Sequence, residues 1–456
     1  MFRKLLLWIF LVSYLGVADA LKIEIKKGEI QPDPIAVVNF VTKDGEASDD
    51  GTAISDIIRA DLASSGLFLI VKPALFLETA KKLVLKGPNL KNWNVINARF
   101  LVYGDITSCS FGKLVVNFKL TDVVTKQAMF SLEVKGSRSK IREMAHIIGD
   151  HIYTRITNEK GYFNTKIYIV QTNKDKKSDE RTAFITEIGQ DGHGANVLTD
   201  GKHLVVTPRC MPDGRSIAFL QLPNLGDRDG APRTEILNVY SKSTRHLISD
   251  SIIRKLKKEN GGKTVQMAYA PRFSPDSTMA VLAIIIDGKS AIYKLDLTSN
   301  DLTQLTQHKC IDTSPCFTPD GEYIIFTSNR AGKEAIYKME ADGSNPIKIS
   351  KGPGKYSQPM VSPRGDLIAF SYQRGGVFYV GTMRLDGSGE NLILNGYMVE
   401  APCWAANGRY IAASMTSNPG AKSQIVVVDI TGHHVRMILT PGDAQYPAWG
   451  PLLDNQ

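Results

Sequence analysis

Pro315-Cys316-Phe317-Thr318-Pro319-Asp320-Gly321, followed by the apolar run 323–327, is one of six related segments in the second half of this 456-residue chain. In each segment a Pro precedes a mostly apolar pair, and a second Pro, four residues after the first, usually opens a tight turn. The six segments begin at Pro208, Pro271, Pro315, Pro359, Pro402 and Pro447. Their spacings are 63, 44, 44, 43 and 45 residues. A period near 44 is the length of one four-stranded propeller blade.

One period divides directly into strands and turns. Residues 319–321 supply the fixed φ of Pro and then the positive φ of Gly, as a tight turn needs. The runs 323–327 and 335–339 have the apolar, β-branched and aromatic composition of strands. Asp342-Gly343 is a second turn before a last strand at 347–349. We therefore predict four-stranded antiparallel blades, because a sandwich would space its strands irregularly and a solenoid would show shorter periods or helices.

The two ends of the repeat region each lack part of a blade. After the last segment there is room for one innermost strand, whereas three strands, at 167–170, 183–186 and 195–198, precede the first segment. We expect the sixth blade to combine strands from both ends, which removes an exposed edge. The long first spacing implies an insertion of about 20 residues. We expect this insertion to be an elongated loop between Pro223 and Lys263.

Residues 21–160 lack the repeat and alternate predicted strands with predicted helices. Strands are expected at 35–38, 68–71, 100–102, 114–120 and 128–134. Helices are expected around the apolar face of Ile54, Ile57, Ile58 and Leu62, from Ala74 toward Leu85, and along the stripe of Ile141, Ala145, Ile148, Ile152 and Ile156. We therefore predict a small α/β domain with a mixed sheet over 21–160, followed by an all-β six-bladed propeller over 161–456.

Residues 1–20 are predicted to be a secretory signal peptide. Arg3 and Lys4 precede an apolar run, and Ala18 and Ala20 occupy the small −3 and −1 positions of a cleavage site. A membrane anchor is the alternative, but uninterrupted apolar character ends near Ala18, which is short of the ~20 residues that a spanning helix needs. We therefore expect an exported protein without direct membrane insertion.

The formal charge of +9 comes from 55 Lys and Arg against 46 Asp and Glu. The signal segment contributes +1 through Arg3, Lys4 and Asp19, so the remainder carries +8. Its densest basic groups, 174–177 and 254–258, lie in polar stretches without interleaved aromatic residues. Solvated loops therefore explain them better than a nucleic-acid groove, and no nucleic-acid partner is expected.

The five cysteines have no metal-ligand spacing. We expect them mostly as small buried hydrophobes. Cys316 and Cys403 occupy equivalent positions on blades separated by a whole intervening blade. Because stacked sheets are ~10 Å apart, these two thiols are predicted to be too distant for a disulfide.

Motifs of catalysis are weak in this sequence. It contains no GxSxG nucleophile elbow. Residues 287–290, Asp-Gly-Lys-Ser, resemble the end of a phosphate-binding loop, but Ala283 stands where the first Gly is required. His433-His434 follows a Gly in a predicted exposed turn, and His146 and His151 lie five residues apart rather than on one helix face. No enzyme, metal or cofactor site is predicted.

An exported α/β domain followed by six blades with the pattern P-x-aromatic-S-P-D-G resembles the TolB family, periplasmic proteins of the Tol-Pal cell-envelope system of Gram-negative bacteria. The resemblance covers the whole mature chain: 21–28 is similar to the family's N-terminal strand, 161–173 to its inter-domain junction and 447–451 to its C-terminal closure. The departures are Cys210 in place of an aromatic residue, Ser277 in place of the turn Gly, Ala405-Ala406-Asn407 in place of Ser-Pro-Asp, and the insertion.

The resemblance implies a monomeric scaffold that binds a Pal-type lipoprotein through the propeller and a TolA-type inner-membrane protein through an N-terminal arm. Such a scaffold would link the two membranes for envelope integrity and constriction during cell division. The arm is formed by Leu21, Lys22, Ile23, Glu24, Ile25 and Lys26, which alternate apolar and charged residues, with Pro32 and Pro34 as the hinge. Two alternatives are a secreted propeller enzyme such as a lactonase, favoured by tightly bound metal, and a polyanion-binding propeller, favoured by salt-sensitive binding to unrelated polyanions.

The loops that lead into the innermost strands of a propeller emerge on one face, near the axis. We therefore predict that the Pal-binding face is formed by Met267, Tyr269, Ala270, Thr313, Ser314, Tyr356, Ser357, Gln358, Val399, Glu400, Ala401, Gln445 and Tyr446. Their mixture of aromatic, small and hydroxyl side chains suits a protein interface better than a catalytic pocket. By resemblance, Met267, Ala270 and Thr313 match loop positions at which proteins of this family meet Pal.

Overall fold

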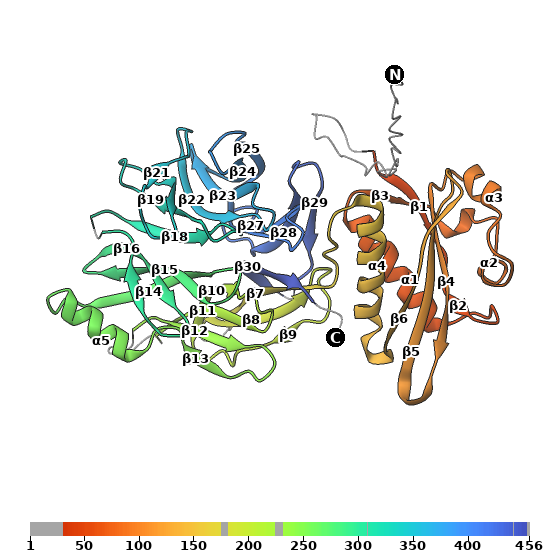
Figure 1. Ribbon diagram of the computed structural model, residues 1–456, viewed down its shortest axis with the longest axis horizontal. Helices are drawn as coiled ribbons and strands as arrows, with labels where there is room; N and C mark the ends of the chain where they lie inside the picture. The colour runs from red at the N-terminus through yellow and green to blue at the C-terminus, as the bar shows by residue number, and fades with distance from the viewer. Residues whose placement is uncertain (1–30, 175–180, 224–230, 308, 441, 454–456) are drawn as a thin grey trace, which may run out of the picture.

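The computed structural model describes residues 31–174, 181–223, 231–307, 309–440 and 442–453. It confirms the predicted fold class, because an α/β domain with a mixed sheet is followed by an all-β propeller of six blades (Figure 1). The two parts lie side by side along the long axis of the molecule. The predicted cleavage site at Ala18 and Ala20 and the predicted arm, Leu21 to Lys26, lie outside the described residues.

The sheet of the α/β domain contains six strands in the order β3-β1-β4-β5-β6, with β2 also paired to β4. Their bounds are β1 Asp33–Val37, β2 Val41–Thr42, β3 Phe68–Ile70, β4 Phe100–Ser108, β5 Lys113–Asp122 and β6 Gln127–Ser137. Strand β1 runs parallel to β3 and β4, whereas β4, β5 and β6 are antiparallel neighbours. The predicted mixed sheet is therefore present, and β2 is a short addition to it.

Helices cover both faces of this sheet. Their bounds are α1 Asp49–Ser64, α2 Ala80–Lys86, α3 Leu90–Val95 and α4 Ile141–Thr157, with short 3₁₀ turns at Pro73–Leu75, Ser110–Gly112 and Arg138–Lys140. Helices α1 and α4 pack against each other on the face toward the propeller, around a core that includes Ile54 and Ile148 (Figure 1). Helices α2 and α3 close the other face around Leu83 and Trp93.

The second helix is shorter than the sequence predicts. One helix was expected from Ala74 toward Leu85, but α2 begins only at Ala80, after a 3₁₀ turn. The Thr79 side chain accepts a hydrogen bond from the Lys82 N–H at 3.3 Å and so sets the start of the helix. Helix α3 follows Asn89 in the same way and buries Trp93, although no apolar periodicity indicated it.

Each blade of the propeller is a four-stranded antiparallel sheet. Blades 1 to 3 are formed by β10 Leu204–Cys210, β11 Ser216–Leu222, β12 Arg233–Asn238 and β13 Thr244–His246; β14 Val265–Phe273, β15 Met279–Ile286, β16 Lys289–Asp296 and β17 Leu302–Gln304; and β18 Asp312–Phe317, β19 Tyr323–Ser328, β20 Ala335–Glu340 and β21 Ile347–Lys348. Blades 4 and 5 are formed by β22 Lys355–Val361, β23 Leu367–Arg374, β24 Val377–Arg384 and β25 Asn391–Gly396; and β26 Met398–Trp404, β27 Tyr410–Thr416, β28 Gln424–Asp429 and β29 Val435–Ile438.

Blade 6 joins the two ends of the propeller, as predicted. It consists of β30 Asp443–Leu452, β7 Thr165–Lys174, β8 Arg181–Gly189 and β9 Asn196–Val197, in the order β30-β7-β8-β9. The first strands of consecutive blades contact one another, and β30 contacts β10, so the innermost strands form a closed ring. Closure leaves no exposed sheet edge between the chain ends.

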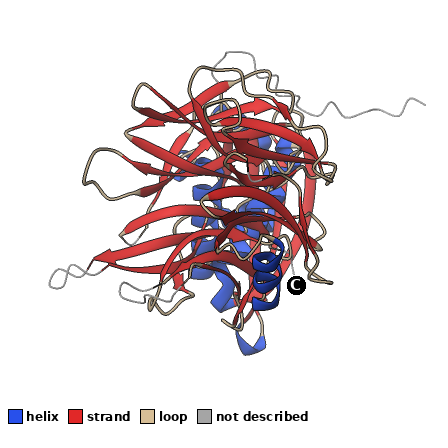
Figure 2. Cartoon of the chain, turned by 90° about the vertical axis from the view of Figure 1, so that its left-hand side faces the viewer, coloured by secondary structure: helices blue, strands red, loops and turns tan. Residues whose placement is uncertain are grey.

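The insertion in the first spacing is not the elongated loop that the sequence predicts. It contains helix α5, Asp250–Glu259, directly before the innermost strand of blade 2. The Ser249 side chain caps the helix by accepting from the Ile252 N–H at 3.4 Å, and Ile252 and Leu256 are buried against the blade. Arg254, Lys255, Lys257 and Lys258 therefore lie on the exposed side of an amphipathic helix. The helix lies in front of the sheets in Figure 2.

All five cysteines are free, so Cys316 and Cys403 are not bridged, as predicted. Both of these thiols are buried, but Cys109 is exposed, which corrects the expectation of small buried hydrophobes at that position. Asp287 and Gly288 form a turn between β15 and β16, with φ 54° and 74°, and Lys289 and Ser290 begin β16. Among the described residues, no helix combines the length and apolar character needed to cross a bilayer.

Candidate functional site

The predicted Pal-binding residues lie in the innermost strands, not in the loops before them. Strands β14, β18, β22, β26 and β30 already include these positions. In all six innermost strands, including β10, the residue directly before the anchor Pro has a left-handed backbone. The φ angles are 52° at Thr207, 51° at Ala270, 51° at Ser314, 52° at Gln358, 54° at Ala401 and 52° at Tyr446. Pairing with the second strand shifts register at each of these points. A bulge with positive φ bends a strand and redirects its side chains, so six equivalent bulges surround the axis.

Most of the predicted residues are partly exposed at this end of the strands. These are Met267, Tyr269, Ala270, Thr313, Ser314, Ser357, Gln358, Glu400, Gln445 and Tyr446, which we call the open face. Tyr356 and Val399 are 1% and 0% exposed, and Ala401 is also buried, so the prediction needs correction at these positions. The Tyr356 hydroxyl donates to Glu390 at 2.6 Å and its ring packs on Phe370, because alternate residues of a strand point into the blade.

A hollow of about 200 Å³ lies between blades 4 and 5 on the open face, lined in part by Ser357, Gln358 and Glu400. The side-chain oxygen of Gln358, Oε1, accepts hydrogen bonds from the Ser371 hydroxyl at 2.9 Å and from the Ala401 N–H at 2.8 Å. It therefore joins blades 4 and 5. Burial raises the pKa of Glu400. The hollow therefore offers polar groups and one desolvated carboxyl group to a partner.

Helix α5 borders the same face beside blade 2. A smaller hollow, of about 90 Å³, is lined by Ile253 of the helix together with Met267 and Ala268 of β14. Arg254, Lys257 and Lys258 are exposed on the outer side of the helix. The insertion thus places Ile253 beside Met267 and turns its basic side chains outward.

The opposite face of the propeller is covered by the α/β domain. The Tyr410 hydroxyl of β27 donates to the Ser65 carbonyl at 2.7 Å, and His434, between β28 and β29, contacts the Ser64 carbonyl at 2.8 Å. Gly66 is required there, because a Cβ atom would lie 2.5 Å from the His434 ring and its φ is +72°. His434 was predicted in a plain exposed turn, but the structure uses it as a contact between the domains.

Glu159, just after α4, binds two arginines of the propeller. Its carboxylate oxygens lie 3.3 Å from Arg409 of blade 5 and 3.2 Å from Arg364 of blade 4. The blade 5 turn has Ala405-Ala406-Asn407 in place of Ser-Pro-Asp. Asn407 and Arg409 are 3% and 2% exposed, whereas Asp320 in the blade 3 turn is exposed. A neutral Asn keeps the turn, since its side-chain oxygen accepts from the Arg409 N–H at 3.0 Å, without burying another carboxylate. The contact with the α/β domain explains the departure.

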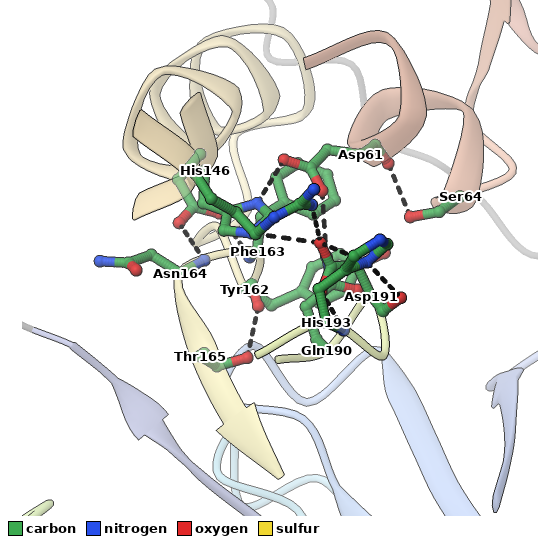
Figure 3. A network of polar contacts seen from close by, with 12 residues as sticks. Asp61, Ser64, His146, Tyr162, Phe163, Asn164, Thr165, Gln190, Asp191 and His193 are labelled. Carbon is green, nitrogen blue, oxygen red and sulfur yellow. Dashed lines mark hydrogen bonds and ion pairs between the residues drawn. The ribbon is translucent and has the colours of Figure 1, made fainter. Parts of the chain in front are cut away.

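A buried polar network lies at the centre of this contact (Figure 3). His146 of α4 places Nδ1 2.7 Å from Asp61 of α1 and Nε2 3.4 Å from Asp191 in the β8–β9 loop. Gln190 of the propeller donates to the second Asp61 oxygen at 3.0 Å. Asp191 also pairs with Arg142 of α4. Two carboxylates from different domains thus enclose one imidazole.

The electrostatics of the network favour a charged His146. Burial would lower the pKa of His146, but the Asp191 and Asp61 carboxylates outweigh it and raise that pKa to about 9. Burial would raise the pKa of Asp191, but His146, the His193 N–H and Arg142 hold it well below its usual range. An imidazolium held between two carboxylates stabilises the domain contact; it is not poised near neutral pH for proton transfer.

Aromatic side chains complete the contact between the domains. Tyr162 lies 4.4 Å from Tyr410, 4.6 Å from Phe163 and 6.0 Å from Trp449, measured between ring centroids. The hydrophobic core of the α/β domain continues without a break through these rings into blades 5 and 6. Asp150 anchors the junction by accepting from the N–H groups of Phe163 and Asn164 at 2.7 and 2.9 Å, and burial raises its pKa to about 7.

Sequence reasoning did not identify the residues of this contact. No contact was predicted for His146 or His434, because their partners Asp61, Asp191 and Ser64 are distant in sequence. The one sequence feature that could have indicated the domain contact is the altered blade 5 turn, Ala405-Ala406-Asn407. In the described parts of the chain, no three His, Cys, Asp or Glu side chains are grouped so that they could hold a metal ion.

One face of the propeller packs on the α/β domain, and the other face stays partly exposed around the bulged inner strands. These features place the chain in the class of two-domain propeller proteins. The TolB amino-terminal domain pattern matches residues 21–129, and the TolB beta propeller domain pattern matches residues 153–453. The chain is 41% identical over 450 residues to the Tol-Pal system protein TolB of Paramagnetospirillum magneticum, with 96% of each chain covered. It is 38% identical over 445 residues to that of Rickettsia bellii, with 95% of each covered.

The fold is also that of a solved structure. The crystal structure of TolB from Acinetobacter baumannii matches with a TM-score of 0.78 at 22% sequence identity, and the match covers 92% of this chain and 97% of that one. The chain therefore belongs to the TolB family, whose members are Tol-Pal system proteins. The names of these relatives describe a component of that system, not an enzyme.

Proposed function

We propose that this protein is a periplasmic scaffold that binds a Pal-type lipoprotein through the open face and a TolA-type inner-membrane protein through the arm Leu21 to Lys26. In this role it links the two membranes for envelope integrity and constriction during cell division. The signal peptide directs export and is cleaved after Ala20. Membership of the TolB family supports the Tol-Pal role.

The observation that carries the Pal-binding part is the asymmetry of the propeller. Its other face is occupied by the protein's own α/β domain, through the Asp61–His146–Asp191 network and the Tyr162 aromatic cluster. The open face keeps partly exposed Met, Tyr, Ser and Thr side chains around six bulges. Such a mixture is typical of protein interfaces.

The test is the double substitution Ala270→Trp with Thr313→Trp on blades 2 and 3. The position of Ala270 accepts a large aromatic residue, because Tyr446 occupies it in blade 6 with the same backbone φ. We expect loss of Pal binding in a calorimetric titration, with TolA binding and Tm unchanged. The matched control, Thr303→Trp with Lys348→Trp, changes exposed outer strands of the same two blades and should bind Pal normally. A folded double variant that binds Pal at wild-type affinity would exclude this face.

The arm has a separate test, since it belongs to another part of the chain. Deletion of residues 21–27 should abolish TolA binding and leave both Tm and Pal binding unchanged. Loss of folding would instead make these residues part of the core. N-terminal sequencing of the exported protein tests cleavage, and a mature form that begins at Met1 contradicts the periplasmic location.

The alternative propeller functions predict other results. A lactonase-like enzyme would purify with tightly bound metal, and a polyanion-binding protein would bind heparin and nucleic acid alike with a strong dependence on salt. Elemental analysis and a salt titration of polyanion binding separate these functions from the scaffold.

A further inference from the structure

Glu400 is the one carboxylate among the two residues that precede each anchor Pro. It lies two residues before the anchor Pro of blade 5, on the open face. The other positions of these two levels hold uncharged side chains: Val206, Tyr269, Thr313, Ser357 and Gln445, followed by the bulge residues Thr207, Ala270, Ser314, Gln358, Ala401 and Tyr446. The negative charge is therefore a feature of blade 5 and not of the repeat.

The carboxylate of Glu400 has no partner within the protein. In the described ranges of the chain, Glu400 makes no hydrogen bond and no ion pair, and burial alone raises its pKa. The residue is only partly buried, and neither of its side-chain oxygens belongs to the fully buried polar atoms without a partner, so a ligand can reach both oxygens. A desolvated carboxylate without a cation is unfavourable, and a cation that pairs with it would relieve this cost.

The hollow of about 200 Å³ that Glu400 lines has a further charge and an aromatic wall. Phe378 contributes a partly exposed ring beside the Ser357 hydroxyl. Lys355 and Glu334 also line the hollow and pair with each other, at 3.7 Å between Nζ and Oε2. The lining thus contains two carboxylates and one ammonium group, which gives a net charge of −1 and leaves Glu400 as the unpaired member.

We propose that this hollow receives an arginine side chain of the protein that binds the open face. The two free oxygens of Glu400 match the planar fork of a guanidinium group, and the ring of Phe378 offers it an aromatic surface. Arginine is also enriched at protein interfaces, whereas lysine is depleted there. A metal ion fits less well, because it needs several oxygen ligands and Glu334 is already paired with Lys355. The inference rests on the proposed Pal-binding function and names the chemistry that the partner presents.

The first test is a calorimetric titration of the full mature protein with the Pal-type lipoprotein at pH 8. Glu400→Gln keeps the shape of the side chain and removes its charge, so Kd should rise about 10- to 100-fold. The Tm of the unbound variant should be unchanged or higher, because the lost carboxylate has no partner in the protein. Glu322→Gln, which changes an exposed carboxylate between β18 and β19 of blade 3, is the matched control and should bind normally.

The second test is the pH dependence of the same titration. Because Glu400 takes up a proton as the pH falls from 8 to 5, the ratio of the Glu400→Gln Kd to the wild-type Kd should fall toward one. Glu334 and Lys355 in the hollow and Tyr446 beside Glu400 are present in both proteins, so their own titration largely cancels in the ratio. A ratio that stays constant would contradict pairing with a charged Glu400.

A double-mutant cycle tests the arginine itself. Each arginine of the partner is replaced by Met in turn, and Kd is measured with wild-type protein and with Glu400→Gln. One replacement should lose most of its effect in Glu400→Gln, since the two side chains act as a pair. If no arginine of the partner is coupled to Glu400, the hollow does not receive one.

The outcomes also separate this inference from the proposed function. An unchanged Kd in Glu400→Gln, together with loss of binding in the Ala270→Trp and Thr313→Trp double variant, overturns the arginine site and leaves the Pal-binding face in place. A wild-type protein that does not bind the lipoprotein overturns both. If Glu400→Gln does not fold, Glu400→Ala replaces it with the same expected rise in Kd, and an unchanged Kd there is equally decisive.

Discussion

The two faces of the propeller are built from one repeat but have opposite surroundings. On the face toward the α/β domain, the blade 5 turn is buried, the β28–β29 turn contacts the α/β domain through His434, and Glu159, His146 and Asp61 bind propeller groups. On the open face, the equivalent ends of the inner strands stay partly exposed around six bulges. The comparison shows that the repeat gives both faces a similar backbone, whereas individual side chains such as Arg364, Arg409 and Gln190 make the contacts on the covered face.

The largest expected difference between the faces is in the packing of aromatic residues. Tyr162→Ala removes a fully buried ring between the domains and should lower the free energy of unfolding by about 3–5 kcal/mol. Tyr446→Ala on the open face should cost less than about 1 kcal/mol, because its ring is partly exposed. Urea unfolding of both variants measures this. Equal losses would mean that the two faces are equally packed.

The second difference is a pH dependence confined to the covered face. The folded-state pKa of His146 is about 9 against an ordinary 6.5, so its stabilisation is fully present below pH 6.5 and is lost as the pH rises through 9. The loss should be on the order of 3 kcal/mol. His146→Asn should be less stable at pH 6 and nearly independent of pH between 6.5 and 9, as Tm measurements can show.

Another group of the covered face titrates in a lower range. Asp150, with its pKa raised to about 7, makes the protein less stable as the pH rises from about 4 to 7, which lies below the His146 window. A wild-type Tm that stays constant from pH 6.5 to 9 would contradict a charged His146 between Asp61 and Asp191.

The third effect concerns the link between blades on the open face. Gln358→Leu leaves the N–H of Ala401 without its acceptor and should cost about 1–2 kcal/mol. Gln445→Leu, at a partly exposed position of blade 6, should be close to neutral. Hydrogen exchange of the Ala401 amide provides the measurement. If its protection is unchanged in Gln358→Leu, this side chain does not join blades 4 and 5.

The smallest effect tests a turn toward the covered face. Ser277 has φ +60° where the equivalent turns of blades 1 and 3 have Gly214 and Gly321. Ser277→Gly should raise the free energy of unfolding by about 0.5 kcal/mol, since only Gly adopts this backbone without steric cost. The reverse change, Gly321→Ser, should lower it by a similar amount. If the free energy of unfolding changes in the same direction in both variants, the positive φ at these turns does not explain the effect.

The period of the sequence predicts the propeller because each blade has its own turn signals. Pro and Gly in segments such as 319–321 set the local backbone without help from distant residues, and unequal ends at 167–198 and 447 imply a shared sixth blade. Local signals failed where capping residues matter more than apolar periodicity. Thr79 shortened one helix, and Ser249 created α5 inside the predicted loop.

The candidate sites show a similar limit. Counting residues before each anchor Pro located one end of the inner strands. Because these positions were expected in loops, the count did not separate partly exposed Tyr269 from buried Tyr356. Tyr356 lies three residues before its Pro and Tyr269 two, and successive residues of a strand point to opposite faces. The bulges themselves became visible only as six non-Gly residues with positive φ.

By itself, the sequence determined the two domains, the six blades and the way the ring closes, because turn chemistry and strand period are local properties. Only the tertiary structure decided that His146 becomes charged between Asp61 and Asp191 and that His434 packs on Gly66. The reason is that burial and the distance to a partner set the energy of a charge. Both arise only when segments such as 61, 146 and 191 are brought together by folding.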